Sequence, residues 1–492
     1  MLFNSPLFLF LFLPSAVAVY LLLNCRGWFL LSKMWVVSAS LLFYGYANVK
    51  YLPLISGSIL FNYLVGISIG RCGTRNDIAG SRRKGILALG IVVNLVLLGY
   101  FKYTDFFLTN INNILNLHFS VLRIALPLGI SFFTFTQVAY LIDAYKESTA
   151  ESGFLNYALF VSFFPRLLAG PIMRYKEMSP QLGAVADKTV NYRNLATGIF
   201  LFSIGLFKKV VLARTCGDWA NNGFEHAQVL TFIEAWVTSL SYSLELYFDF
   251  SGYTDMALGA ALMFNFKLPV NFNSPYRAIN IQDFWSRWHM TLSRFLRDYI
   301  YIPLGGNRYG DYKRYQSLLI TFLVCGLWHG AGWLFIFWGF LHGVAMVVYH
   351  LWRKLNVRMN TFLAWILTFN FVNASWLFFR AKDWSDAVGV LKGMVGINGI
   401  KLPLSWSADL GFLSGRIAFT DGWLGATQRT WEIIFIIAGF LLLTLFGRNS
   451  NQTAEHFRPG WVAGLFTVSL LFVAFVCIFA TDIPSKFIYV NF

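Results

Sequence analysis

The apolar residues of this chain lie in long runs that are separated by short polar segments. Candidate spans, each of which needs about 20 residues to cross a bilayer, are expected at residues 6–23, 34–48, 51–70, 86–101, 121–142, 195–213, 231–264, 360–379, 431–447 and 460–480. Because these runs are continuous rather than alternating, they indicate membrane-spanning helices. The pattern predicts an all-α, polytopic integral membrane protein whose residues 1–492 form one membrane domain.

Two apolar stretches contain too many helix-breaking residues to be plain spans. Residues 154–172 include Pro165 and Pro171, and residues 325–342 include four glycines together with His329. Non-helical backbone at membrane depth is tolerated only where protein or a water-filled cavity surrounds it. We therefore expect both stretches to be re-entrant elements that line one cavity.

The composition agrees with a membrane location. Of the 492 residues, 57% are hydrophobic and 13% are charged, with a mean hydropathy of +0.57, whereas a soluble protein carries about 25% charged residues. The net charge of +16 is not interpreted as a sign of nucleic-acid binding. In a membrane protein, Lys and Arg collect in cytoplasmic loops and meet anionic lipid headgroups or a phosphate-bearing ligand.

The distribution of basic residues predicts the orientation. The loop at residues 71–85 is strongly basic, so it should be cytoplasmic and the N-terminus should lie outside. Counting spans onward also places the basic stretch 267–314 inside. The positive-inside rule places basic residues at the cytoplasmic ends of spans. Lys208, Lys209 and Arg214 fall near the outer end of their span and do not follow it.

The five cysteines are scattered along the chain and have no zinc-type spacing. We therefore expect no disulfide framework, no structural metal and no bound cofactor.

The segment from residue 280 to 299 should form an amphipathic helix. Asn280 can cap its start, and Asp283 and Arg287 have the favourable i,i+4 order. One interpretation is a helix lying on the inner leaflet, with its arginines on lipid phosphates. The other is that some of the arginines contact the phosphates of a cytoplasmic ligand, the candidates being Arg277, Arg287, Arg294 and Arg308.

His329 lies inside an apolar run and is a candidate general base. A neutral imidazole near pH 7 can activate a hydroxyl or thiol, and the glycines around His329 would give a ligand close access. A packed, hydrogen-bonded core histidine is the alternative. Cys325 is spaced i,i+4 from His329, which permits a thiol–imidazole pair, although a buried cysteine is more often a small hydrophobic residue. His289 is either a second catalytic or positioning group or an ordinary interfacial histidine.

Asp249 and Asp255 are acids within an apolar run. They could pair with arginines of the basic stretch or cap a broken helix. We expect a structural pairing rather than a proton relay.

Long motifs in the chain resemble the membrane-bound O-acyltransferase (MBOAT) superfamily, and most closely its branch that serves bacterial alginate O-acetylation. The motifs are FFPRLLAGPIMR (163–174), YFDFSGYTDMALG (247–259), FWSRWHMTLSRFLRDYIYIPLGGNR (284–308), CGLWHGAGWLFIFWGFLHG (325–343) and FIYVNF (487–492). The D-alanine exporter of teichoic-acid modification is similar around RWHMTLS. The resemblance covers about residues 30–380 and the C-terminus.

The resemblance implies that His329 is catalytic, that His289 is the second family histidine, and that a central funnel or tunnel leads to them. Acetyl-CoA would be the co-substrate, approaching from inside a bacterial inner membrane. The acetyl group would pass to periplasmic acetyltransferase partners that modify an exopolysaccharide such as alginate. The catalytic core would cover about residues 121–380, with a periplasmic loop at about 381–429. The candidate donor-binding residues are Arg287, Arg294, Trp288, Trp328 and Asn307.

Other functions remain open at this point. Within acyl transfer, the alternative is D-alanyl or another acyl transfer to a cell-wall polymer. A transporter or flippase for a lipid-linked saccharide is a different class, although its usual broken helices in corresponding halves are not found here. A non-catalytic scaffold for a polysaccharide synthase is the third. An oxyanion donor could be the indole N–H of Trp328 or Trp333, or a backbone amide.

Overall fold

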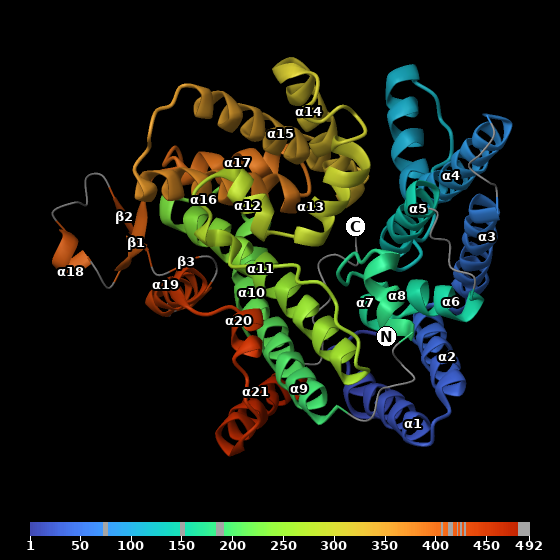
Figure 1. Ribbon diagram of the computed structural model, residues 1–492. Helices are drawn as coiled ribbons and strands as arrows, with labels where there is room; N and C mark the ends of the chain where they lie inside the picture. Colours follow the sequence, from blue (N-terminus) through green and yellow to red (C-terminus); the bar gives the residue numbers. More distant parts are fainter. Residues whose placement is uncertain are drawn as a thin grey trace.

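The computed structural model describes residues 1–71, 77–147, 153–183, 191–404, 407–411, 417–420, 422–423, 426–427 and 430–480. The motif at residues 487–492 and part of the basic loop at 71–85 lie outside these ranges. Figure 1 shows the long central helix α11, with the N-terminal helices on one side and helices α12–α17 on the other.

The elements before α11 are helices of very different lengths. They are η1 (Phe8–Phe12), α1 (Leu13–Cys25), α2 (Phe29–Ala47), η2 (Val49–Tyr51), α3 (Leu52–Arg71), α4 (Asp77–Leu115), α5 (Ile130–Glu147), α6 (Phe154–Ser162), α7 (Phe164–Leu167), α8 (Tyr175–Gly183), α9 (Tyr192–Phe207), η4 (Lys208–Ala213) and α10 (Arg214–Glu225).

The elements from α11 onward contain the segment singled out from the sequence. They are α11 (Phe232–Met263), η5 (Pro275–Arg277), α12 (Ile281–Arg287), α13 (Met290–Leu296), η6 (Arg297–Tyr301), α14 (Gly310–His329), α15 (Trp333–Lys354), α16 (Thr361–Arg380), α17 (Trp384–Met394), β1 (Lys401–Pro403), α18 (Ser407–Leu410), β2 (Ala418–Thr420), β3 (Gly422–Trp423), β4 (Ala426–Thr427), α19 (Thr430–Phe446), α20 (Ser450–Glu455) and α21 (Trp461–Phe479). Strand β1 pairs with β2 in parallel and β3 with β4 antiparallel.

The helical membrane architecture is confirmed. Among the residues described, eight helical stretches are long and apolar enough to cross a membrane: Phe8–Cys25, Phe29–Ala47, Val49–Arg71, Gly80–Leu115, Tyr192–Glu225, Trp333–Lys354, Thr361–Arg380 and Trp461–Phe479. Glu432–Phe446 is a shorter apolar helix. The runs expected at 121–142 and 231–264 are not among the eight. Residues 121–129 of the first run do not form a helix, and α11 carries four acids that lower its apolar character.

The two re-entrant predictions have different outcomes. The stretch 154–172 is interrupted as predicted: α6 and α7 are short, and the buried Arg166 donates hydrogen bonds to the carbonyls of Phe160 and Met173. The stretch 325–342 is broken only at residues 330–332, and α15 then continues as a full-length helix. The second prediction was wrong beyond this break, because the residues that follow the glycines are an unbroken apolar run.

Helix α11 packs closely against α9 through glycines. A Cβ added to Gly205 would lie 2.5 Å from the Gly252 carbonyl oxygen, and one added to Gly198 would lie 2.7 Å from the Gly259 carbonyl oxygen. Small residues at such crossings let helix backbones approach each other, which is how helices associate in membranes. This contact holds α11 in the centre of the molecule.

The acids of α11 form structural ion pairs, as predicted, but with other partners than predicted. Asp255 pairs with Lys208 at 2.8 Å, and Asp249 pairs with the buried Lys209. Both lysines come from η4, not from the arginine-rich stretch. Because a buried ion costs several kcal/mol unless it is paired, these lysines have a packing role and need not obey the positive-inside rule.

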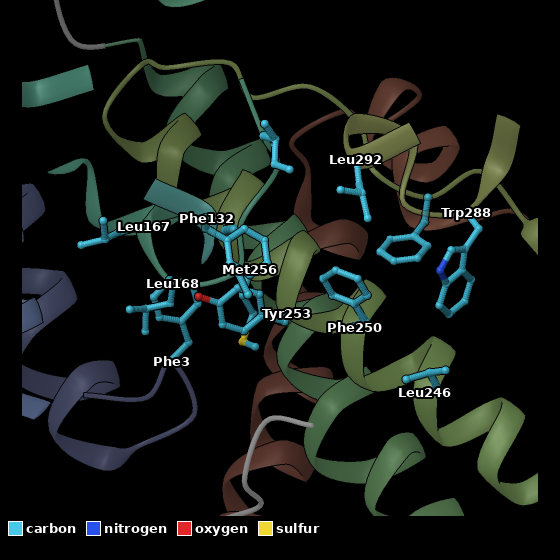
Figure 2. Packing of buried hydrophobic residues seen from close by; sticks show 14 of the residues in the cluster. Phe3, Phe132, Leu167, Leu168, Leu246, Phe250, Tyr253, Met256, Trp288 and Leu292 are labelled. Carbon is cyan, nitrogen blue, oxygen red and sulfur yellow. The ribbon is translucent and has the colours of Figure 1, made fainter. Parts of the chain in front are cut away.

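The core runs along both faces of α11. Figure 2 shows Tyr253 and Met256 beside Phe3 from the N-terminus, and the rings of Phe3 and Tyr253 stack at 4.9 Å. On the other side, Phe250 packs edge-on against the imidazole of His289, with 4.8 Å between ring centroids. Helix α11 is therefore the wall against which one of the candidate histidines is placed.

Candidate active site

The segment expected to be one amphipathic helix is divided into two. Helix α12 begins after Asn280, whose side chain accepts a hydrogen bond from the Asp283 N–H at 2.8 Å, and Arg287 pairs with Asp283 at 2.7 Å. These two predictions are confirmed. The chain then breaks at His289, whose φ of 44° lies in the left-handed region, a conformation that is uncommon outside glycine and often marks functional sites.

His289 is fully buried at this break, so it is not an interfacial histidine. Its Nδ1 lies 3.1 Å from Asn271 Oδ1, which also accepts hydrogen bonds from the Thr291 N–H at 3.2 Å and its hydroxyl at 2.9 Å. Since Oδ1 can only accept, His289 Nδ1 carries the proton and Nε2 carries the lone pair. Within the described ranges, this buried Nε2 has no hydrogen-bond partner.

His329 is the last residue of α14 and has the same tautomer. Its Nδ1 lies 2.7 Å from the Cys325 carbonyl oxygen, so the ring donates through Nδ1–H and its lone pair is on Nε2. The ring is 2% exposed and packs against the rings of Trp338 and Phe379, at 5.0 Å and 5.3 Å between centroids.

Trp328 lies between the two histidines. Its ring centroid is 4.9 Å from that of His329 and 6.1 Å from that of His289. The buried indole N–H of Trp328 lacks a hydrogen-bond partner in the described structure. The indole N–H of Trp333, in contrast, donates to Asn110 Oδ1 at 2.8 Å. Of the two tryptophans, Trp328 is therefore the one whose ring lies beside both histidines and whose N–H has no partner in the described structure.

Cys325 and the nearby glycines have packing roles. The Cys325 Sγ lies 3.8 Å from His329 Nδ1, but that nitrogen already donates its proton to a carbonyl. A Cβ on Gly326 would lie 2.2 Å from the Phe335 carbonyl oxygen, and one on Gly330 would lie 2.3 Å from the Phe335 ring. The prediction that these two glycines make room for a ligand was wrong, because α15 fills that space.

A cavity of about 580 Å³ lies beside α12 and α13. Its lining includes Met290 and Thr291, the two residues that follow His289, together with polar side chains on the same elements. The lining residues are Pro269, Val270, Gln282, Trp285, Ser286, Met290, Thr291, Ser293, Arg294, Arg297 and Met346. A volume of roughly 300–1,000 Å³ is typical of small-molecule sites. A passage from this cavity to His329 stays a prediction.

The structure separates the predicted donor-binding residues. Arg294 lines the cavity and pairs with Glu177 at 2.5 Å. Arg287 is held by Asp283 and is not part of the lining. Trp288 is buried among aromatic rings, with the ring centroids of Phe272 and Trp376 each 5.0 Å from its own. Asn307 is exposed in the turn after η6, outside the cavity lining.

Sequence reasoning missed His342, for which it proposed no role. The Trp285 indole N–H donates to His342 Nδ1 at 3.1 Å, and His342 Nε2 lies 3.0 Å from the Ser375 hydroxyl. This histidine joins a cavity-lining tryptophan to α16. Sequence reasoning also missed Asn271, because nothing in the sequence indicates that an asparagine 18 residues from His289 fixes the tautomer of that histidine.

The described structure is thus a helical membrane protein with two buried histidines inside the bundle, each carrying its lone pair on Nε2. The chain belongs to the MBOAT, membrane-bound O-acyltransferase, family, whose model matches residues 8–382. It is therefore an acyltransferase of the O-acetyltransferase type, and the family prediction made from its motifs is confirmed.

Several relatives carry more specific names. The chain is 47% identical to a peptidoglycan O-acetyltransferase of Helicobacter pylori, covering 100% of this chain and 98% of the relative. It is 35% identical to a probable alginate O-acetylase AlgI of Pseudomonas putida over 100% of both chains. A teichoic acid D-alanyltransferase of Bacillus subtilis is 31% identical over 52% of this chain and 69% of its own.

Proposed function

We propose that this protein takes acetyl from cytoplasmic acetyl-CoA and passes it across the inner membrane for O-acetylation of peptidoglycan. The nearly end-to-end match to a peptidoglycan O-acetyltransferase favours this polymer. Alginate or a similar exopolysaccharide is the second candidate, supported by the end-to-end match to a probable alginate O-acetylase. D-alanyl transfer is less favoured, because that relative matches only about half of the chain.

The observation that carries the proposal is the shared tautomer of the two buried histidines. His329 Nε2 accepts the proton of the acceptor hydroxyl while the hydroxyl oxygen attacks the thioester carbonyl carbon. The Trp328 indole N–H donates to the carbonyl oxygen as it gains negative charge. When the tetrahedral intermediate collapses, the C–S bond breaks and the CoA thiolate takes the proton from His329. His289 Nε2, which can also only accept, orients the acceptor through a hydrogen bond from a neighbouring hydroxyl.

The acetyl donor would enter through the cavity beside α12 and α13. Arg294 and Arg297 line it and pair with Glu177 and Asp298, and their remaining N–H donors would meet the phosphates of CoA. The cavity reaches Met290, the neighbour of His289, so the thioester end of the donor would point toward the histidines. The acceptor would arrive from the periplasmic side, delivered by a periplasmic acetyltransferase partner.

Deletion of the protein from its host should remove the O-acetyl esters of peptidoglycan and leave the amount of peptidoglycan unchanged. Without the protein no acetyl group reaches the polymer, but the synthesis and export of the polymer do not depend on acetylation. The measurement is acetate released by mild base from purified sacculi, compared with the total muramic acid content.

Three other outcomes would contradict this proposal. Loss of the polymer itself would point to a transporter. Loss of acetyl from an exopolysaccharide, with peptidoglycan acetylation intact, would assign the second candidate polymer. Loss of ester-linked D-alanine would assign the teichoic-acid reaction.

Neutralising the cavity arginines should weaken donor binding. In the double variant Arg294→Gln with Arg297→Gln, the KM for acetyl-CoA should rise by about tenfold or more, since a charge-assisted hydrogen bond contributes about 1.5–3 kcal/mol. The KM of the wild type should also rise with ionic strength, and this dependence should be smaller in the variant. The exposed Arg358→Gln is the matched control. Unchanged affinity in the double variant would exclude this cavity as the donor site.

A further inference from the structure

The C-terminal end of α14, where His329 lies, is capped by another helix. The last four carbonyls of a helix have no partner within it. The Gly326 carbonyl accepts from the Gly330 N–H at 3.3 Å. The Tyr103 hydroxyl of α4 donates to the Leu327 carbonyl at 2.8 Å. The remaining two carbonyls therefore need a donor from outside α14.

That donor is the ammonium of Lys102, the neighbour of Tyr103 on α4. Its Nζ donates to the Trp328 carbonyl, lies 3.4 Å from the His329 carbonyl oxygen and lies 3.3 Å from the Ser131 hydroxyl. A cation is favourable at the negative end of a helix dipole. The three donors of the ammonium each have an acceptor here, which explains how a lysine is tolerated within the apolar span Gly80–Leu115.

Helix α4 also holds the chain on the other side of the break. Asn110, two turns after Lys102, accepts from the Trp333 indole N–H at 2.8 Å, and Phe106 lies 5.8 Å from the Trp333 ring. The break at residues 330–332 has extended backbone at Gly330 and Gly332. Contacts from a single helix therefore fix both ends of the segment that begins at His329.

We propose that Lys102 is a positioning residue for His329, an inference that rests on the proposed function. The ammonium fixes the Trp328 and His329 carbonyls, and through them the direction in which the Trp328 and His329 side chains leave the end of α14. Lys102 does not touch the reacting atoms. Its loss should let this last turn fray and move the base away from the thioester.

The test uses the full-length protein in detergent with acetyl-CoA, with added membranes of the host as the source of acceptor, and free CoA as the product. Lys102→Met should lower kcat roughly 10²-fold, because a displacement of about 1 Å in the reacting groups has that effect. The KM for acetyl-CoA should stay within about twofold, since donor binding lies elsewhere. Lys102→Arg, which keeps the charge and the donors, should recover most of kcat. The exposed Lys50→Met is the matched control.

A kcat for Lys102→Met equal to the wild-type value, or a failure of Lys102→Arg to exceed Lys102→Met, would overturn the proposal. A rise in KM with unchanged kcat would also overturn it, because it would place Lys102 in donor binding. If Lys102→Met does not fold, Ser131→Ala decides: a partial loss of kcat supports positioning, and no loss contradicts it. Absence of CoA release by the wild type would instead contradict the proposed function.

Discussion

His329→Ala should lower kcat for acetyl transfer by roughly 10²–10⁴-fold, the range that a general base contributes. The variant removes the only lone pair that His329 presents, because its Nδ1 proton is donated to the Cys325 carbonyl. The KM for acetyl-CoA should change little, since the donor cavity is lined by α12 and α13. The measurement is release of CoA by the solubilised protein with host membranes, together with O-acetyl content in cells.

His329→Gln separates the loss of the base from a loss of structure. The glutamine amide can still donate to a carbonyl and fills similar space, but it is not a base at neutral pH. It should therefore be as inactive as His329→Ala while keeping the thermal stability of the wild type. The control is His226→Ala, an exposed histidine outside the site. A glutamine variant with near wild-type kcat would show that His329 acts only through packing.

The second large effect is expected at His289. The informative variant is His289→Asn, because asparagine tolerates the left-handed conformation seen at this residue. It removes the imidazole Nε2 without adding backbone strain. We expect kcat to fall by about 10²-fold or more if Nε2 orients the acceptor, with a smaller change in the KM for acetyl-CoA.

Asn271→Asp provides a graded comparison with His289→Asn. The aspartate keeps an oxygen that accepts hydrogen bonds from His289 Nδ1 and from Thr291. The Asn271→Asp variant should therefore keep a higher kcat than the His289→Asn variant. The thermal unfolding midpoint of each variant shows whether the fold is preserved. If His289→Asn keeps wild-type kcat and a wild-type unfolding midpoint, then His289 is a structural core residue and the reaction uses one histidine.

Much of the architecture could be predicted because apolar run length is a local property. The spans around α1, α2, α3 and α16 lie close to where the runs placed them. The break in the stretch 154–172 follows from its prolines. The division of the 280–299 segment could not be predicted, because its polar and apolar spacing suits a continuous helix. The left-handed turn at His289 is stabilised by Asn271, a contact between residues far apart in sequence.

The sequence allowed the candidate histidines of the site to be predicted, but not the residues that contact them. The two histidines stand out as ionisable groups in apolar sequence, and the structure places Trp328 between them. Lys102 does not stand out in this way, because a lysine directly after the apolar run 86–101 indicates the end of a membrane span. Only the three-dimensional packing shows that α4 continues to Leu115 and that this lysine reaches the end of α14.

The paired charges of η4 and α11 also have a consequence for biosynthesis. Lys209 precedes Asp249 by 40 residues and Lys208 precedes Asp255 by 47, so the segment that carries the lysines leaves the ribosome first. Each segment alone would expose ionic groups to lipid, at a cost of about 2.5–3.5 kcal/mol per charge on insertion scales. The insertion machinery should therefore retain α9 and η4 at its lateral gate until α11 arrives, and release the two helices into the bilayer together.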